Sequence, residues 1–284
     1  MARTLKVVTS INGRLVPYGR DKISVFDNAL LYAEGLFETF LAIDDRIIFM
    51  EEHLERLYNG ARIIGLDIPA PPSSLAAWMR KTVRAHPDRI TKLRLTITSG
   101  ESARYVGQQG KPQVILSASP HQMPSQPFKL WVSDFRVDQQ SVFRQIKTLS
   151  YAIHAAALRQ AHRERCDDAL LLNERNHVAE VTSANVYWVM RGRLYTPPLS
   201  AGCLEGVTRK RVFKEAAVLG LKISEKNTTL PALVEADEVL ISSSLKLVVG
   251  VARVKTPART YVTRTGPVTK LITRHFRQLV GLER

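Results

Sequence analysis

A proline-rich segment near the middle of the chain limits the folds that are open to it. The segment runs from Pro120 to Pro127 and contains three prolines. Because proline fixes φ and lacks a backbone N–H, the segment is unsuited to a regular helix or a central strand. The residues on either side are numerous enough to bury separate cores. We therefore predict an N-terminal domain at 1–119, a linker at 120–127 and a C-terminal domain at 128–284.

The first half of the chain mixes strand and helix patterns. Asn12-Gly13 is a hairpin signal within 6–16, and Lys92-Leu-Arg-Leu-Thr-Ile-Thr98 alternates as a strand does. Apolar residues recur at helical spacing over 50–64. A second helix is predicted to start with Ser73 or Ser74 as its cap and to end near His86. Further strands are predicted at 23–26, 37–43, 46–49 and 113–119.

The second half shows the same mixture in another order. Helices are predicted at 151–161 and 207–219, and the second ends before Gly220, a residue typical of helix C-termini. Because strands and helices do not alternate regularly, the pattern indicates the α+β class. Strands are predicted at 129–132, 168–173, 186–190, 194–196, 236–241 and 247–254.

The chain is strongly basic, which raises nucleic-acid binding as one hypothesis. It contains 41 Lys and Arg residues against 26 Asp and Glu, a formal net charge of +15. The sequence has no aromatic–basic interleaving, zinc-finger spacing or GxxG clamp of the kinds that nucleic-acid-binding modules use. A solvated basic surface is therefore favoured, and we expect no nucleic-acid partner.

The cysteines and the apolar runs bear on metal binding and location. Cys166 and Cys203 have neither metal-ligand spacing nor a disulfide framework, so we expect no metal site. No apolar run has the length of a membrane span, and the first residues lack the apolar core of a signal peptide. We expect a cytoplasmic protein that makes no membrane contact.

Lys147 and Glu180 are the first candidates for chemistry. Lys147 lies between a polar, turn-prone segment and an alanine-rich helical stretch, where its side chain can be held rigidly. A lysine that forms a Schiff base must first lose its proton. Glu180 interrupts the apolar run His177-Val-Ala-Glu-Val and is suited to pair with a pyridinium nitrogen. The alternatives are an ordinary surface lysine and an outward-facing strand residue.

Hydroxyl groups and one arginine are candidates for binding a phosphate. Gly206-Val207-Thr208 opens a helix, where free N–H groups and the helix dipole favour an anion. Ser242-Ser243-Ser244 follows a predicted strand and offers further hydroxyls. Arg56 lies on the first predicted helix and is either a solvated charge or a bidentate phosphate ligand. An ordinary helix cap and a polar strand exit are the alternatives for the two hydroxyl segments.

In their order along the chain, these segments resemble the class IV aminotransferases, pyridoxal phosphate (PLP) enzymes of fold type IV. That family includes branched-chain aminotransferases, D-amino acid aminotransferases and 4-amino-4-deoxychorismate lyases. The resemblance covers nearly the whole chain. The matching segments are Gly35-Leu-Phe-Glu-Thr39, Glu52-His-Leu-Glu-Arg-Leu57, Ile146-Lys-Thr-Leu-Ser150, Asp168-Ala-Leu-Leu-Leu172, Val178-Ala-Glu180, Asn185-Val-Tyr-Trp188, Thr196-Pro-Pro198, Gly206-Val-Thr-Arg209 and Ala236-Asp-Glu-Val239.

The resemblance implies a two-domain α+β fold similar to D-amino acid aminotransferase, a homodimer, and a set of residue roles. Lys147 would bind PLP covalently and move a proton between the substrate and the cofactor. Glu180 would pair with the ring nitrogen. The other implied cofactor contacts are ring packing by Leu204 and phosphate binding by Arg56, Val207, Thr208, Ser243 and Ser244.

The substrate pocket separates the branches of the family. Arg94 matches an arginine of the branched-chain enzymes, whereas Arg104 partly fits the glycine loop of the lyase. The Ile-Lys-x-Leu-Ser pattern suits the lyase or the D-amino acid branch better than the branched-chain one. Ser99 and Glu101 stand where D-amino acid aminotransferases carry a carboxylate trap. We expect a transaminase that moves an amino group between an amino acid or amine and a 2-oxo acid, similar to the branched-chain enzymes. The alternatives are a lyase that releases pyruvate and 4-aminobenzoate, and a basic nucleic-acid-binding protein. The implied pocket residues are Phe37, Arg94, Arg104 and Tyr151.

Overall fold

The computed structural model describes residues 7–101 and 110–283, which group into two compact units. Unit 1 is Met1–Met123 with Ile146–Ser150, and unit 2 is Pro124–Gln145 with Tyr151–Arg284. The sequence-based prediction had assigned Lys147 to the C-terminal domain, and this grouping differs from it. The reason is local, because backbone hydrogen bonds attach the Lys147 segment to a strand of unit 1. The domain boundaries themselves stay a prediction.

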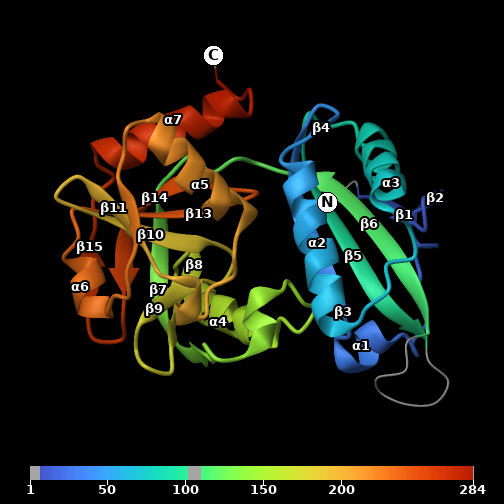
Figure 1. Cartoon of the computed structure of the whole chain (residues 1–284), viewed down its shortest axis with the longest axis horizontal. Helices are drawn as coiled ribbons and strands as arrows, with labels where there is room; N and C mark the ends of the chain where they lie inside the picture. The colour runs from blue at the N-terminus through green and yellow to red at the C-terminus, as the bar shows by residue number, and fades with distance from the viewer. Residues whose placement is uncertain (1–6, 102–109, 284) are drawn as a thin grey trace. The chain divides into compact units, whose positions relative to one another are not determined.

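In the described part of unit 1, six strands form an antiparallel sheet in the order β2-β1-β6-β5-β3-β4. Two helices, α2 (Met50–Ile64) and α3 (Pro72–Arg84), cover one face of this sheet (Figure 1). A short helix, α1 (Asn28–Tyr32), precedes β3. The strands are β1 (Val8–Ile11), β2 (Arg14–Val16), β3 (Gly35–Ile43), β4 (Arg46–Ile47), β5 (Ile90–Glu101) and β6 (Lys111–Pro120).

The core of unit 1 forms because alternate strand residues and one helix face are apolar. Leu36 and Phe40 on β3 and Leu95 on β5 pack with Leu54 and Leu57 of α2 in one buried cluster. Successive strand residues point to opposite faces of a sheet, so Phe37 and Glu38 face different environments. This alternation decides which residues of β3 can reach a site.

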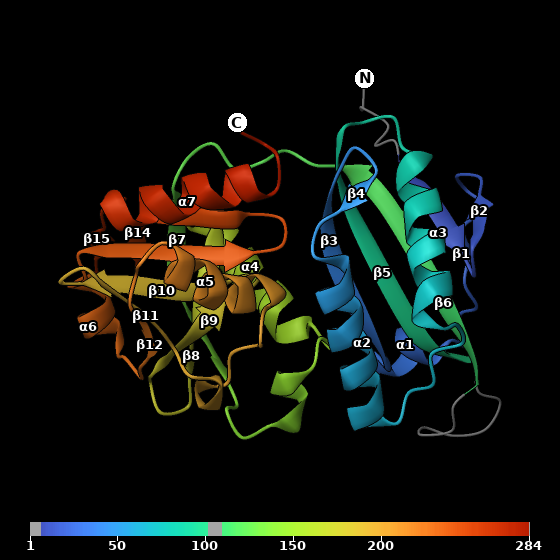
Figure 2. The same cartoon turned by 45° about the horizontal axis from the view of Figure 1, so that its top comes forward.

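In the described part of unit 2, nine strands form a mixed sheet in the order β12-β11-β10-β13-β14-β7-β8-β9, with β15 paired to β14. Helix α7 packs on β14, and α4 packs on β7 and β8 (Figure 2). The helices are α4 (Ala152–Arg163), α5 (Val207–Val218), α6 (Leu230–Val234) and α7 (Pro267–Leu279), with short 3-10 turns at Val142–Gln145 and Leu199–Ala201. The strands are β7 (Phe128–Val137), β8 (Asp168–Asn173), β9 (Val178–Val181), β10 (Asn185–Met190), β11 (Arg193–Thr196), β12 (Ile223–Glu225), β13 (Glu238–Ser243), β14 (Leu247–Lys255) and β15 (Thr260–Val262).

Most predicted elements are confirmed, and some are wrong. Helix α2 and strand β8 have the predicted bounds. The strand predicted at 23–26 is a turn before Asp27, whose carboxylate accepts from the Ala29 N–H and caps α1. Ser73 and Ser74 lie inside the first turn of α3, because proline at its start fixes the entry to the helix. Within residues 7–101 and 110–283, no helix is long and apolar enough to cross a membrane.

Candidate active site

Strand β3 holds Lys147 through its backbone. The Phe37 N–H donates to the Lys147 carbonyl at 3.0 Å, and the Leu149 N–H donates to the Gly35 carbonyl at 3.0 Å. Leu36 and Thr148 form an antiparallel bridge in the same stretch. Residues 146–150 therefore run beside the start of β3, which fixes the backbone from which the lysine projects.

Two cations meet the aromatic ring of Phe37. The Lys147 Nζ atom lies 4.4 Å from the ring centroid, and the Arg94 Cζ atom lies 3.9 Å from it. A cation over an aromatic face is attracted by the ring quadrupole, so the buried Phe37 ring positions both side chains. Arg94 Nε also donates to Thr96 Oγ1 at 3.1 Å. The structure thus brings together three residues that the sequence assigned to the cofactor and substrate.

A buried ion-pair cluster lies on the opposite face of β3. Glu38 is 1% exposed and accepts from His53 Nδ1 at 2.6 Å. Arg56 donates to the same carboxylate through Nε at 2.7 Å and through Nη2 at 2.6 Å. His53 and Arg56 are one helical turn apart on α2, so both can reach one carboxylate. A two-bond arginine–carboxylate pair of this kind is strong and fixes geometry.

The charges in this cluster are set by burial and proximity. Burial alone would raise the pKa of Glu38, but Arg56 and His53 oppose it and hold this pKa down at about 2. Burial lowers the pKa of His53, and the nearby charges of Arg56 and Lys147 lower it further, against the influence of Glu38. The cluster is therefore a carboxylate, a neutral imidazole and a guanidinium at neutral pH.

Arg56 was predicted to bind phosphate, and its guanidinium is bound to Glu38. This contact leaves the phosphate role of Arg56 a prediction. Glu38 and His53 were not singled out from the sequence. A signal for them exists, because Glu38 is a carboxylate in an apolar strand and His53 lies three residues before Arg56 on a predicted helix.

In unit 2, Glu180 on β9 lies among three hydrogen-bond donors. Its Oε1 atom accepts from Arg144 Nη2 and from His154 Nε2, the latter at 3.1 Å. Its Oε2 atom accepts from the Leu204 N–H at 2.9 Å. Burial would raise the pKa of Glu180, but the bond from His154 and the charge of Arg144 hold it below the ordinary value. Glu180 is therefore a buried anion, the form that would retain a protonated ring nitrogen.

Tyr151 contacts His154, one of the residues bound to the Glu180 carboxylate. Its ring stacks on His154 with centroids 4.3 Å apart and an interplanar angle of 15°. Its hydroxyl donates to the Thr182 carbonyl. The sequence assigned Tyr151 to the substrate pocket, and that role stays a prediction. Sequence reasoning missed Arg144 and His154, because their contact with Glu180 joins residues far apart in the chain.

The start of α5 provides an orphaned hydroxyl. The helix begins at Val207 with Gly206 as its N-cap residue, and the cap has no side-chain hydrogen bond. Thr208 is 2% exposed, and its Oγ1 atom has no hydrogen-bond partner among the described residues. A buried unsatisfied hydroxyl is costly unless a ligand satisfies it. Together with the free N–H groups of the first turn, it fits a phosphate.

The remaining predicted residues lie just before α5, at the turn after β13, or outside the described residues. Leu204 contributes its backbone N–H to Glu180. Ser243 accepts from the Lys246 N–H at 3.3 Å within the turn between β13 and β14, and Ser244 lies in the same turn. Arg104 lies outside the described residues, so its pocket role also stays a prediction.

Comparison with known proteins gives a family match over most of the chain. A family model described as amino-transferase class IV matches residues 35–254. A relative from Methanocaldococcus jannaschii, named as a candidate branched-chain-amino-acid aminotransferase, is 32% identical over 251 residues and covers 85% of each chain. An aminodeoxychorismate lyase from Bacillus subtilis is 28% identical, covering 83% of this chain and 82% of the lyase.

Solved structures give the same result for the fold. The branched-chain aminotransferase of Thermoproteus uzoniensis, solved with norvaline, has a TM-score of 0.88 with this chain. The two are 28% identical, and the match covers 96% of this chain and 94% of the other. Another branched-chain aminotransferase, 27% identical and with the same TM-score, was solved in complex with N-(5'-phosphopyridoxyl)-L-glutamate. The predicted α+β fold of type IV is confirmed.

Proposed function

The chain belongs to the class IV aminotransferase family, and on that premise we propose that it moves an amino group between a branched-chain amino acid and a 2-oxo acid. The observation that carries this proposal is the pairing of Lys147 and Arg94 on the ring of Phe37. An amino acid substrate needs PLP held rigidly at its amine and a cation held rigidly at its carboxylate. Lys147 would hold PLP and Arg94 would supply the cation, and both side chains lie against the Phe37 ring.

The enzyme uses PLP, and the residues present fit this cofactor. When bound, PLP supplies a ring that accepts electrons from the α-carbon of the substrate. We assign covalent attachment to Lys147 and pairing with the ring nitrogen to the anionic Glu180. The orphaned Thr208 hydroxyl and the first-turn amides of α5 are assigned to the phosphate.

The chain's own groups then divide the work of proton transfer and orientation. Lys147, once its amine is free, would take the α-proton from the substrate and move it to the cofactor. Arg94 orients the substrate carboxylate with its planar fork of donors. His154 and Arg144 keep Glu180 charged, and the Glu38–Arg56 pair holds α2 against β3.

A single-turnover experiment tests the proposal. The PLP-loaded enzyme is mixed with one of several branched-chain amino acids, with no oxo acid present, and the cofactor absorbance is followed. We expect conversion to the amine form of the cofactor in the wild type and none in Lys147→Ala. Retention of the original spectrum with every amino donor would overturn the transaminase assignment.

Arg94→Met tests the carboxylate role. We expect KM for a branched-chain amino acid to rise by about tenfold or more, because a charge-assisted hydrogen bond is lost. The matching amine, which lacks the carboxylate, serves as the control substrate and should show little change. An equal effect on both substrates would remove Arg94 from carboxylate binding.

The lyase remains the second candidate, because a relative with that name covers most of the chain. It predicts release of pyruvate and 4-aminobenzoate from aminodeoxychorismate with no oxo acid added. Assaying this substrate beside the amino donors distinguishes the two activities.

We also propose that the protein is a homodimer and that it is cytoplasmic. Five large apolar side chains in the segment 25–32 are at least half exposed, which supports an interface with another chain. Cys166 and Cys203 are free thiols, which fits a reducing compartment. Cell fractionation tests the location, and sedimentation of the purified protein tests the dimer.

A further inference from the structure

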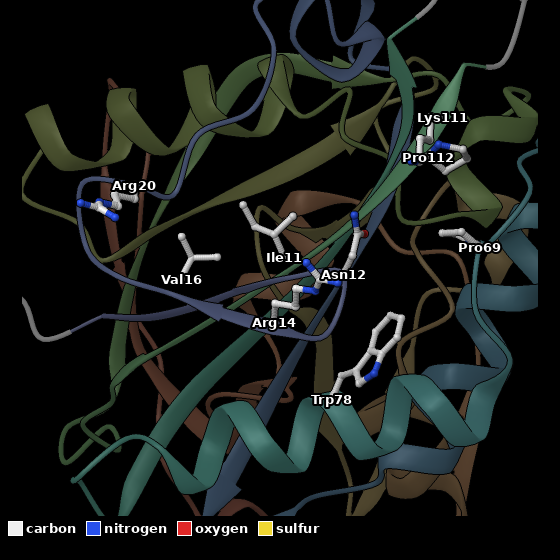
Figure 3. A pocket seen from close by; sticks show the side chains of 9 residues that line it. All are labelled: Ile11, Asn12, Arg14, Val16, Arg20, Pro69, Trp78, Lys111 and Pro112. Atoms are coloured by element: carbon white, nitrogen blue, oxygen red, sulfur yellow. The ribbon is translucent and has the colours of Figure 1, made fainter.

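Unit 1 contains a cavity that shares no residue with the candidate active site. Its volume is about 680 Å³, within the range of small-molecule sites. We call it the hairpin cavity, because the β1–β2 hairpin forms much of its wall. It is lined by Ile11, Asn12, Arg14, Val16, Arg20, Pro69, Trp78, Lys111 and Pro112 (Figure 3).

The aromatic wall of the hairpin cavity is held in place. Gly13 has φ of +78°, and a Cβ atom added there would lie 2.4 Å from Trp78 Nε1, so the hairpin turn lies directly against the indole. Lys81 Nζ donates to the Gly13 carbonyl at 3.3 Å and ties the same turn to α3. Figure 3 shows Trp78 projecting from α3 toward the hairpin. The ring is therefore preorganised before any ligand enters.

The other side of the turn is fixed to β6. Asn12 Nδ2 donates to Gln113 Oε1 at 2.8 Å, and Asn12 Oδ1 accepts from the Val114 N–H at 2.9 Å. Lys111 and Pro112 begin β6, so these hydrogen bonds also fix the positions of Lys111 and Pro112 relative to the hairpin. A wall fixed on two sides loses little freedom when it binds a ligand.

The charge around the cavity is of one sign. Arg14, Arg20 and Lys111 line it, and no acidic side chain is among the described lining residues. None of these three cations has an ion-pair partner in the described part of the chain. Asp21, next to Arg20 in the sequence, accepts instead from Thr9 Oγ1 and the Gly19 N–H. Like charges around one cavity repel one another, and a bound anion reduces this repulsion.

We propose that the hairpin cavity binds a small organic phosphate that carries a flat ring, as a nucleoside monophosphate does. The indole of Trp78 lines the cavity, and we assign it to stacking against the ring. Two guanidinium groups and an ammonium suit a phosphate, because arginine forks match its oxygens and lysine adds a point charge. Ile11, Val16 and Pro112 supply the apolar surface that such a site needs.

Calorimetric titration of the PLP-loaded full chain with adenosine 5'-monophosphate tests this proposal. PLP is kept bound so that its own phosphate site is filled. Adenosine and inorganic phosphate are titrated separately as the two halves of the probe. We expect the nucleotide to bind at least about tenfold more tightly than either half, because ring and phosphate are held together. Its affinity should fall as salt rises.

Variants locate the binding. Arg14→Gln and Lys111→Gln should each weaken nucleotide binding by about tenfold, and Trp78→Leu should weaken the nucleotide while changing inorganic phosphate little. Arg80→Gln is the matched control. Arg80 is an exposed cation on α3, the helix that carries Trp78, and it does not line the cavity.

Three results would overturn the proposal. One is the absence of heat with the nucleotide, and another is an equal loss in Arg80→Gln and Arg14→Gln, which would indicate attraction to the net charge alone. The third is equal affinity for inorganic phosphate and the nucleotide, which would remove the ring from recognition.

Discussion

At the residue scale, the buried carboxylate Glu38 makes a specific stability prediction. Its pKa falls from an ordinary 4.5 to about 2 in the folded chain. Because the folded pKa is depressed, the stabilisation is complete above pH 4.5 and is lost as the pH falls toward 2. A shift of this size corresponds to about 3 kcal/mol. Between pH 4.5 and pH 2, the free energy of unfolding should fall by about 3 kcal/mol more in the wild type than in Glu38→Gln. Urea unfolding at each pH measures this difference.

The same substitution should also be costly at neutral pH. Glu38→Gln removes the carboxylate charge beside Arg56, whose side chain is 12% exposed, and breaking a buried pair costs about 3–5 kcal/mol. Asp45→Asn is the control, because Asp45 and Arg84 form an exposed pair that should be worth less than about 1 kcal/mol. Equal effects in the two variants would contradict the structural role of the Glu38 cluster.

Arg144 is predicted to act as a positioning residue through Glu180. Its charge is one of the influences that lower the pKa of Glu180, so Arg144→Gln should raise that pKa. Glu180 would then become protonated at a higher pH, and activity should be lost sooner as the pH falls. We expect the acid limb of the kcat profile to move upward and Arg144→Lys to restore part of the shift. A merely structural role would lower activity without moving the limb.

At the element scale, the start of α5 predicts opposite effects on stability and on cofactor binding. Thr208→Val removes a buried hydroxyl that has no partner among the described residues. The cofactor-free protein should therefore be no less stable, whereas PLP affinity should fall by about tenfold. Thermal unfolding of the cofactor-free protein and a PLP titration measure the two quantities.

Thr182→Val is the control for this prediction. The Thr182 hydroxyl donates to the buried Asp168 carboxylate, so removing it should destabilise the protein by about 1–3 kcal/mol. If Thr208→Val destabilised the cofactor-free protein as much as Thr182→Val, its hydroxyl would have a structural partner and the phosphate assignment would lose its support.

The elements also show how far sequence reasoning reaches. Helix α2 was predicted with its correct bounds because its apolar residues recur at regular helical spacing. The turn at 23–26 was misread as a strand because β-branched and aromatic residues there are exposed rather than paired in a sheet. Helix α7 was not predicted, although a proline stands at its first position. Its packing on β14 is a tertiary contact, which local sequence patterns do not reveal.

The candidate site shows the same limit. Lys147 and Glu180 were identified from motifs, and the structure gives each a rigid setting within its own unit. The residues that support Glu180 were not predicted, because Arg144 and His154 are 36 and 26 positions away from it in the sequence. Local patterns carry no information about such pairs, since the fold alone brings them together.

At the scale of the whole molecule, the net charge of +15 and the exposed apolar segment at 25–32 have opposite effects on association between copies of the chain. Charge of one sign promotes solubility and opposes association between copies. The segment at 25–32 promotes it, because Phe26 and Leu30 are each 61% exposed and Val25 is 64% exposed. Exposed apolar residues gathered in one segment typically mark an interface, so we expect association to prevail there.

The dimer prediction follows from that segment. Phe26→Asp combined with Leu30→Asp places charge where the interface would exclude water, and we expect the variant to sediment as a monomer while the wild type sediments as a dimer. Val218→Asp with Val262→Asp is the matched control, because both are exposed apolar residues outside the segment and the charge change is the same. Circular dichroism confirms that each variant is folded. A wild-type monomer, or a dimer that survives Phe26→Asp with Leu30→Asp, would show that this segment does not hold two copies together.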